Sequence, residues 1–202
     1  MTPILISPPT VEPVALADAR EWLRLVETNE DDLVSALIVS ARLMVEAATR
    51  RLLLTQSWRL VFDRWPGLWA SHDGHRPRPE ILVFPLAPFQ SVAAIRVRDA
   101  SGAATTLDPA TYRVIAAPEQ ARVVFNASPP EPGAAAAGIE IDIVCGYGDE
   151  ATSVPEPLRL AIKMLVARWF ENRGDIETDT SVDRLPGPIG ALIGPFRRAR
   201  LT

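Results

Sequence analysis

Three stretches of the chain carry hydrophobic residues at the three-to-four-residue spacing of an amphipathic helix. They predict helices over about residues 15–26, 29–53 and 154–173. Asn29 is placed to cap the second helix, and Ser153 with Glu156 forms a capping-box pattern before the third. The expected buried face of the first helix consists of Leu16, Ala19, Trp22, Leu23 and Val26, and Arg42, Arg50 and Arg51 fall mostly outside that of the second.

Between the second and third helices the hydrophobic period changes from 3.6 to two, which is typical of strands. Strands are predicted over residues 55–63, 80–84, 91–98, 111–116, 121–125 and 139–145, separated by turn-forming sequences. A stretch from Arg64 to Pro79, rich in proline and glycine, predicts a long exposed loop. The expected fold class is α+β: a small bundle of three main helices with an antiparallel β-region, about 55–146, between helices two and three.

The two ends of the chain differ in pattern from this central domain, residues 15–174. Residues 1–14 contain four prolines and predict an extended arm. Residues 175–202 form a tail that begins with acidic residues and continues as LPGPIGALIGPF. Its apolar side chains need a surface to cover them, which either the chain's own domain or a neighbouring chain can supply.

Composition narrows the function classes. The formal net charge of the 202 residues is −4, whereas proteins that grip phosphates usually carry a basic excess. The single cysteine, Cys145, lies in an apolar strand and is expected to be a buried small hydrophobe. No apolar run has the length of a membrane span, and no signal segment opens the chain, so we expect residence in a reducing cytoplasm and no membrane partner.

The candidates for chemistry each have a simpler structural interpretation. Glu140 and Asp142 share one face of a strand, where they could hold a divalent ion or act as an acid/base pair, but the solvated face of an alternating strand is the favoured interpretation. His72 and His75 are too few for a zinc site and are expected in an exposed loop. Gly146 and Gly148 suit a tight turn rather than a dinucleotide loop. We therefore expect no cofactor, no metal and no enzyme.

Taken together, the motifs and their order resemble the head–tail connector, or adaptor, family of long-tailed phages and phage-like gene transfer agents. The resemblance covers nearly the whole chain. It rests on Val14-Ala-Leu-Ala-Asp-Ala-Arg20, Asp31-Asp32-Leu33, Arg50-Arg51, Thr55-Gln-Ser-Trp58, Pro85-Leu-Ala-Pro88, the Gly146-Tyr147-Gly148 turn, Val154-Pro155, Leu158, Ala161-Ile162, Arg173 and Leu192-Ile-Gly-Pro-Phe-Arg197.

The resemblance implies a structural adaptor in the neck of a virion or phage-like particle assembled in the bacterial cytoplasm. Such adaptors form a ring of about twelve copies under the portal protein, join it to a stopper or tail-completion protein, and line the DNA conduit without specific DNA binding. The expected sites for the portal or a neighbouring subunit lie in the tail: Leu185, Ile189, Leu192, Ile193, Pro195, Phe196, Arg197, Arg198 and Arg200. Trp65, Leu68 and Trp69 are the expected contact with the next ring.

Two other functions remain open at this stage. The chain could be a DNA-packaging or nucleic-acid-binding accessory protein if its arginines form a basic stripe, for which the candidates are Arg42, Arg50, Arg51, Arg59 and Arg64. It could also be an enzyme that uses Glu140 and Asp142 with a metal ion.

Overall fold

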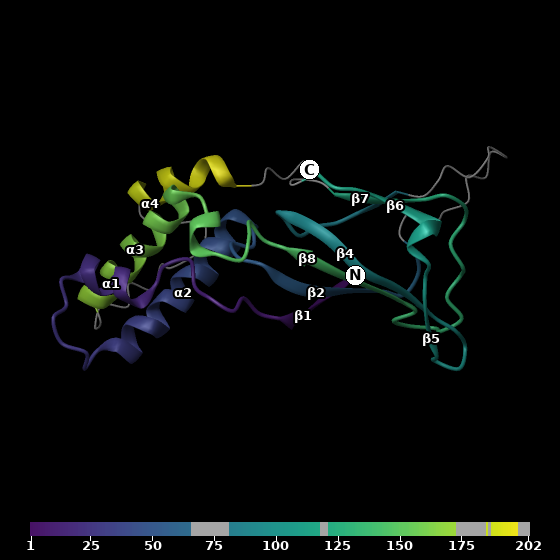
Figure 1. Ribbon diagram of the computed structural model, residues 1–202, viewed down its shortest axis with the longest axis horizontal. Coiled ribbons are helices and arrows are strands. Elements are labelled where there is room, and N and C mark those ends of the chain that lie inside the picture. The colour runs from purple at the N-terminus through teal and green to yellow at the C-terminus, as the bar shows by residue number, and fades with distance from the viewer. Residues whose placement is uncertain (66–80, 118–120, 173–184, 186, 198–202) are drawn as a thin grey trace. The chain divides into compact units, whose positions relative to one another are not determined.

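The computed structural model describes residues 1–65, 81–117, 121–172, 185 and 187–197 (Figure 1). The chain divides into two compact units, each built from segments that are distant in the sequence. The sheet unit comprises Met1–Pro8 and Gln56–Gly146, and the helical unit comprises Pro9–Thr55 and Tyr147–Thr202.

Two antiparallel sheets form the sheet unit. The larger one has the order β1-β2-β8-β4-β5, with β1 Thr2–Ser7, β2 Gln56–Phe62, β8 Ile139–Cys145, β4 Phe89–Arg98 and β5 Ala104–Thr106. The smaller one has the order β3-β7-β6, with β3 Ile81–Val83, β7 Arg122–Phe125 and β6 Tyr112–Ile115, and a short 3-10 turn, Pro109–Thr111, precedes β6. The six strands expected from period-two patterns are confirmed, whereas β5 was not predicted because its three residues, all exposed, show no alternation of apolar and polar positions.

Alternation along the central strand β8 decides which face of the large sheet is inner. Ile139, Ile141 and Ile143 are fully buried on one face, where Leu60 and Ile95 are the cross-strand partners of Ile141. The stacked rings of Phe84, just after β3, and Phe89, on β4, have centroids 5.2 Å apart and link the two sheets. The opposite, outer face of the large sheet carries the charged residues of β8.

The N-terminal arm supplies the edge strand β1 of the large sheet. Its register pairs Pro3 with Leu60 and Ile4 with Arg59. An edge is where a strand tolerates proline, because the missing N–H is not needed by a second neighbour. The rest of the predicted arm, residues 9–14, belongs to the helical unit, so the arm is divided between the two units.

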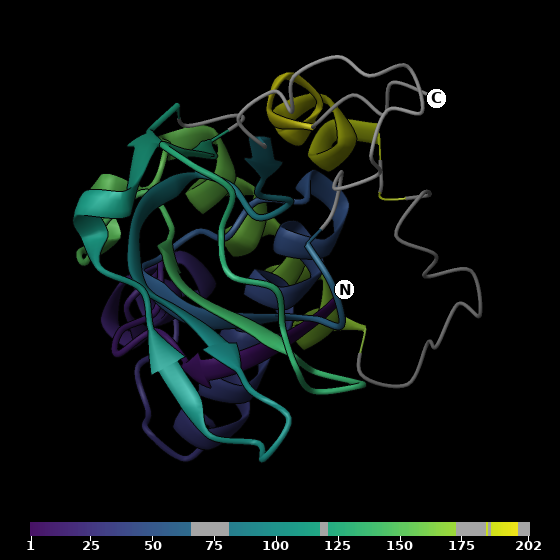
Figure 2. The same cartoon turned by 90° about the vertical axis from the view of Figure 1, so that its right-hand side faces the viewer.

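Four α-helices occur among the described residues of the helical unit: α1 Leu16–Leu23, α2 Asp31–Thr49, α3 Glu156–Glu171 and α4 Gly187–Ile193. The 3-10 turns Ala151–Ser153 and Gly194–Phe196 precede α3 and follow α4. Helix α4 packs beside α3, as Figure 2 also shows. The expected bundle of three main helices is therefore incomplete, and the two sheets are a more prominent part of the fold than predicted.

The helix boundaries differ from those predicted. Helices α1 and α2 end at Leu23 and Thr49, before the predicted residues 26 and 53, and their C-caps Arg24 and Arg50 are both left-handed with φ of 56°. The predicted cap at Asn29 is wrong, because Glu30 is the N-cap of α2 and makes no side-chain capping bond. The capping box before α3 is wrong as well, because Pro155 is the N-cap and Ser153 lies in a 3-10 turn.

The Gly146-Tyr147-Gly148 turn ends β8 and begins the segment that leads to α3. Gly146 has a φ of 132°, in the region that favours glycine, and its N–H donates to the Pro88 carbonyl at 2.8 Å. A Cβ on Gly148 would lie 2.5 Å from the Ser153 hydroxyl oxygen. Each glycine therefore has a steric reason to stand in this turn.

Candidate functional site

The C-terminal segment, predicted to dock on a partner, is divided between the core and the surface. Ile189 and Ile193 on α4 are buried in the core of the helical unit with α2 and α3. Leu185, Leu192 and Phe196 pack against that core and are partly buried, and the Arg51 guanidinium donates a hydrogen bond to the Phe196 carbonyl. Pro195 and Arg197 are exposed, and Arg198 and Arg200 lie outside the described residues.

Trp65, expected in an exposed loop as a contact with the next ring, lies in the core of the sheet unit. It is 4% exposed, its ring meets Phe125 edge to face at 5.0 Å, and its indole N–H donates to the Pro130 carbonyl at 2.9 Å. The prediction of an exposed Trp65 is therefore wrong. Leu68 and Trp69 lie outside the described residues, as do His72 and His75.

Glu140 and Asp142 lie on the outer face of the large sheet, but the prediction that this face solvates them is wrong. They are only 7% and 9% exposed because arginines from the neighbouring strands cover them. The ion pairs are Arg59–Glu140 at 3.3 Å, Arg59–Asp142 at 2.7 Å, Arg96–Asp142 at 2.6 Å and Arg98–Glu140 at 2.6 Å. We call these five residues the arginine–carboxylate ladder.

The electrostatics of the ladder favour ion pairs over a metal ion. Burial raises the pKa of Asp142, but hydrogen bonds from Arg59 and Arg96 outweigh burial, so the pKa lies below its usual value. The hydrogen bond to Asp142 likewise raises the pKa of Arg59. Three guanidinium groups around two carboxylates repel a cation, and no cluster of three or more His, Cys, Asp or Glu that could hold a metal occurs among the described residues.

Cys145, at the end of β8, is fully buried, which confirms the sequence interpretation. Burial raises the pKa of its thiol to about 12. At neutral pH the thiol is therefore protonated and is not poised as a nucleophile. In the part of the chain that the structure describes, no helix is long and apolar enough to cross a membrane.

A second group of charges lies inside the helical unit. The Arg42 side chain on α2 pairs with Glu12 at 2.8 Å and with Glu46 at 3.1 Å, and Glu46 also accepts the Leu53 backbone N–H at 2.9 Å. Arg42 was expected on the outside of the helix, and that expectation is wrong. Because Arg42 and Arg59 are both engaged with carboxylates, they are poor members of the basic stripe that a nucleic-acid-binding protein would need.

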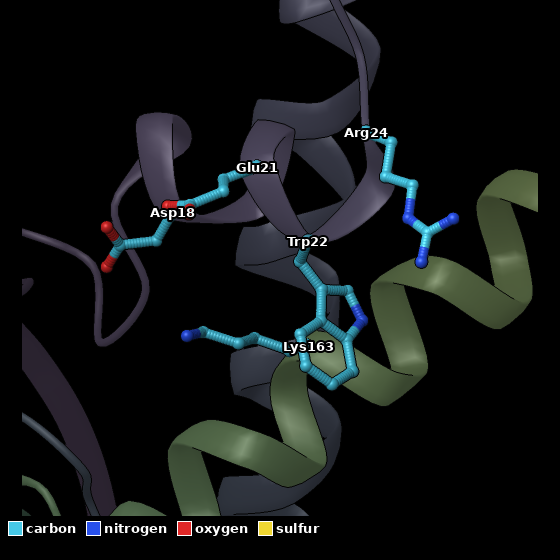
Figure 3. A pocket seen from close by; sticks show the side chains of 5 residues that line it. All are labelled: Asp18, Glu21, Trp22, Arg24 and Lys163. Atoms are coloured by element: carbon cyan, nitrogen blue, oxygen red, sulfur yellow. The ribbon is translucent and has the colours of Figure 1, made fainter.

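The surface of the helical unit carries a hollow of about 560 Å³ lined by residues of α1, its C-cap and α3 (Figure 3). Trp22 forms its centre, with the Lys163 ammonium nitrogen 6.0 Å from the ring centroid. Asp18, Glu21 and Arg24 complete the lining. Trp22 is 46% exposed and Val26 is 91% exposed, so the prediction that both lie on a buried helix face is wrong.

Sequence reasoning also missed two exposed apolar residues of α2, Val39 and Leu43. Both fall outside the hydrophobic stripe expected to face the core. No signal for this was present in the sequence, because Arg42 and Glu46 follow Val39 and Leu43 by three residues and would be expected beside them on the helix surface.

No protein-family model and no curated protein matches the sequence, but solved structures do. The chain is 24% identical, with a TM-score of 0.80, to a chain of the neck of an empty GTA particle computed with C6 symmetry. It is 22% identical, with a TM-score of 0.79, to a chain of the virion of a native gene transfer agent (GTA) particle. It is 23% identical, with a TM-score of 0.74, to a chain of the neck of a native GTA particle computed with C12 symmetry. Each match covers 100% of this chain and 98% of the other. At these identities the likeness shows a shared fold, over the full length of the chain.

Proposed function

We propose that this chain is a structural adaptor in the neck of a gene-transfer-agent or phage-like particle. One observation carries the proposal: the fold match with neck chains spans the entire chain, including both units. A match limited to a helical bundle or to a small sheet would fit many functions, because common folds serve unrelated roles. A match to this combination of units, in this order along the chain, is far more restrictive.

In this role the chain forms a closed ring of about twelve copies beneath the portal and holds a stopper or tail-completion protein below. The C6 and C12 symmetries of the similar necks support a ring of repeated copies. The pairing of Arg42 and Arg59 with carboxylates suits a conduit wall, because each free cation facing the DNA would add a phosphate contact that slows its passage.

The portal contact that we propose uses the outer part of the C-terminal segment. Ile189 and Ile193 serve the helical core, so the predicted residues that are described and keep surface for a partner are Leu185, Leu192, Pro195, Phe196 and Arg197. Arg198 and Arg200 follow them in the sequence and add positive charge for acidic groups on the portal.

The test is to produce particles from cells that carry a tagged copy of the chain and to locate the tag by electron microscopy. We expect the label at the neck, between head and tail. A label on the capsid or on the tail tip, or a chain absent from particles, would overturn the proposal. An Arg197→Glu/Arg198→Glu/Arg200→Glu variant should give folded protein but heads without tails, and Thr152→Glu, an exposed substitution elsewhere in the helical unit, should give normal particles.

A further inference from the structure

Helix α2 buries two charged residues that a surface helix would normally expose. Its charged residues Arg42 and Glu46 point into the unit, where they pair with each other. Its outer face is uncharged and consists of Ser35, Ala36, Val39, Ser40, Leu43 and Ala47, all exposed. Val39 and Leu43, one turn apart, are 37% and 53% exposed and form an apolar ridge between small side chains. A surface helix normally has its charges outside, so this face has the composition of a covered surface.

The chemistry of this face limits its occupant to protein. Nucleic acid is excluded because phosphates are held by cations, and the exposed positions between Asp32 and Arg50 carry none. A helix that lies on a membrane has a polar, cationic opposite face, whereas the opposite face of α2 is the core of the helical unit. Small residues beside a Val–Leu ridge allow another helix to approach closely.

A second, different apolar surface lies at the end of α1. Trp22 and Val26 are exposed there, and the charged residues Asp18, Glu21 and Lys163 line the same hollow as the tryptophan (Figure 3). An aromatic centre within a charged rim is the usual anatomy of a protein–protein contact, and tryptophan is enriched among the residues that dominate binding energy. We call this the Trp22 surface.

The two surfaces lie on different sides of the pair formed by α2 and α3. Helix α2 buries Val34, Ile38 and Val45 in the core that it shares with α3, so its outer face is directed away from α3. The Trp22 ring instead lies against Lys163 of α3. Two unlike apolar surfaces on different sides of one subunit are what a closed ring requires, because each copy contacts its two neighbours through different faces.

We propose that the outer face of α2 in one copy of this chain packs on the Trp22 surface of the next copy, and that this contact repeats around the ring. The inference rests on the proposed role as a ring-forming neck protein, which makes a second copy the occupant. The exposed ends of the α2 face, Asp32 and Arg50, carry opposite charges, and the rim of the Trp22 surface offers both signs to meet them.

The experiment measures self-association of the full-length chain by sedimentation velocity over increasing concentration. We expect the wild type to associate, and both Leu43→Glu and Trp22→Glu to weaken association by at least about tenfold, because each places a charge in the contact. Thr152→Glu, with the same added charge, is the matched control and should associate like the wild type. Leu43 is already half exposed, so its variant should fold, and Ala47→Arg gives a second disruption of the same face.

Mixing the two variants tests the heterologous geometry directly. Each variant keeps one of the two surfaces intact, so Leu43→Glu and Trp22→Glu should be monomeric alone and form a one-to-one dimer together. A mixture without dimer, a Leu43→Glu variant that associates like the wild type, or a wild type that stays monomeric at every concentration would overturn the inference. The tagged-particle experiment tests the proposed function independently. If the chain is found in necks but its Leu43→Glu variant still assembles, only this contact is refuted. If the chain associates as described but is absent from necks, only the proposed function is refuted.

Discussion

The two units of this protein treat charge in opposite ways. In the sheet unit, Arg59, Arg96 and Arg98 spread over Glu140 and Asp142 on the outer face of the large sheet, and about a third of each arginine side chain remains exposed. In the helical unit, Arg42 and Glu46 lie inside, with only 8% and 9% of their side chains exposed. One group of ion pairs covers a surface with charge, whereas the other removes charge from a surface.

This difference shows where each unit can meet other proteins. The partly solvated guanidinium groups of the ladder keep water at the outer face of β2, β8 and β4, so covering that face would require their desolvation. Covering the outer face of α2 between Asp32 and Arg50 requires no such desolvation of charged groups. Inward pairing of Arg42 and Glu46 therefore leaves the surface of α2 apolar, and the contrast between the units predicts different responses to substitution.

The largest effect is expected when one partner of the inner ion pair is removed. Arg42→Met keeps most of the side-chain volume but removes the guanidinium group that pairs with the buried Glu46 carboxylate, so the free energy of unfolding should fall by about 3 kcal/mol. Chemical denaturation followed by circular dichroism measures the loss.

A double variant separates charge from packing in the same experiment. In Arg42→Met/Glu46→Gln both charges are gone, while the glutamine carbonyl can still accept the Leu53 N–H. We expect more than half of the lost stability to return, since replacing both members of a buried pair is often nearly neutral. A double variant as unstable as Arg42→Met alone would mean that the arginine stabilises the helix by its packing rather than through its charge.

The next effect concerns α4, which the helical unit holds by two buried isoleucines. Ile193→Ala should lower the free energy of unfolding by about 2.5 kcal/mol, because the side chain is fully buried and its removal leaves a cavity. Leu192→Ala, one residue earlier and only partly buried, should cost about 1 kcal/mol or less. Equal losses for the two variants would show that α4 is not fixed to the core by the face that carries Ile193.

The position of α4 also shows where prediction from sequence ended. Strands β2, β4 and β8 follow from their alternation, and α2 and α3 from their helical period. Helix α4 was not predicted because Gly187, Gly190 and Gly194 weaken a helical pattern, and only the core that receives Ile189 and Ile193 makes it stable. Tertiary packing thus decides this element.

The candidate surfaces were harder to predict for a related reason. Periodicity assigns Glu140 and Asp142 to the correct face of β8, but the arginines that bury them come from strands 83 and 46 residues away in the sequence. Val26 was assigned to a buried helix face, yet α1 ends at Leu23 and the left-handed Arg24 redirects the chain. A sequence pattern indicates on which face of a strand or helix a residue lies, whereas the exposure of its side chain depends on which other segments the fold packs against that face.

The smallest effect is expected from the ladder. Asp142→Asn keeps the shape of the side chain and one acceptor oxygen for Arg59 and Arg96, whose charges water already screens in part. The free energy of unfolding near neutral pH should therefore fall by only about 1 kcal/mol.

The pKa of Asp142 is lower in the folded protein than in the unfolded chain, where it is about 3.9. Its contribution is thus present above that value and is lost as the pH falls through the lower folded pKa, because protonation then favours the unfolded chain. Thermal unfolding at decreasing pH should show the gap between wild type and Asp142→Asn close below about pH 4, while the exposed control Asp149→Asn stays close to the wild type near neutral pH. A gap that widens as the pH falls would mean that the ladder does not stabilise the ionised carboxylate, and the contrast between the two units would then not hold.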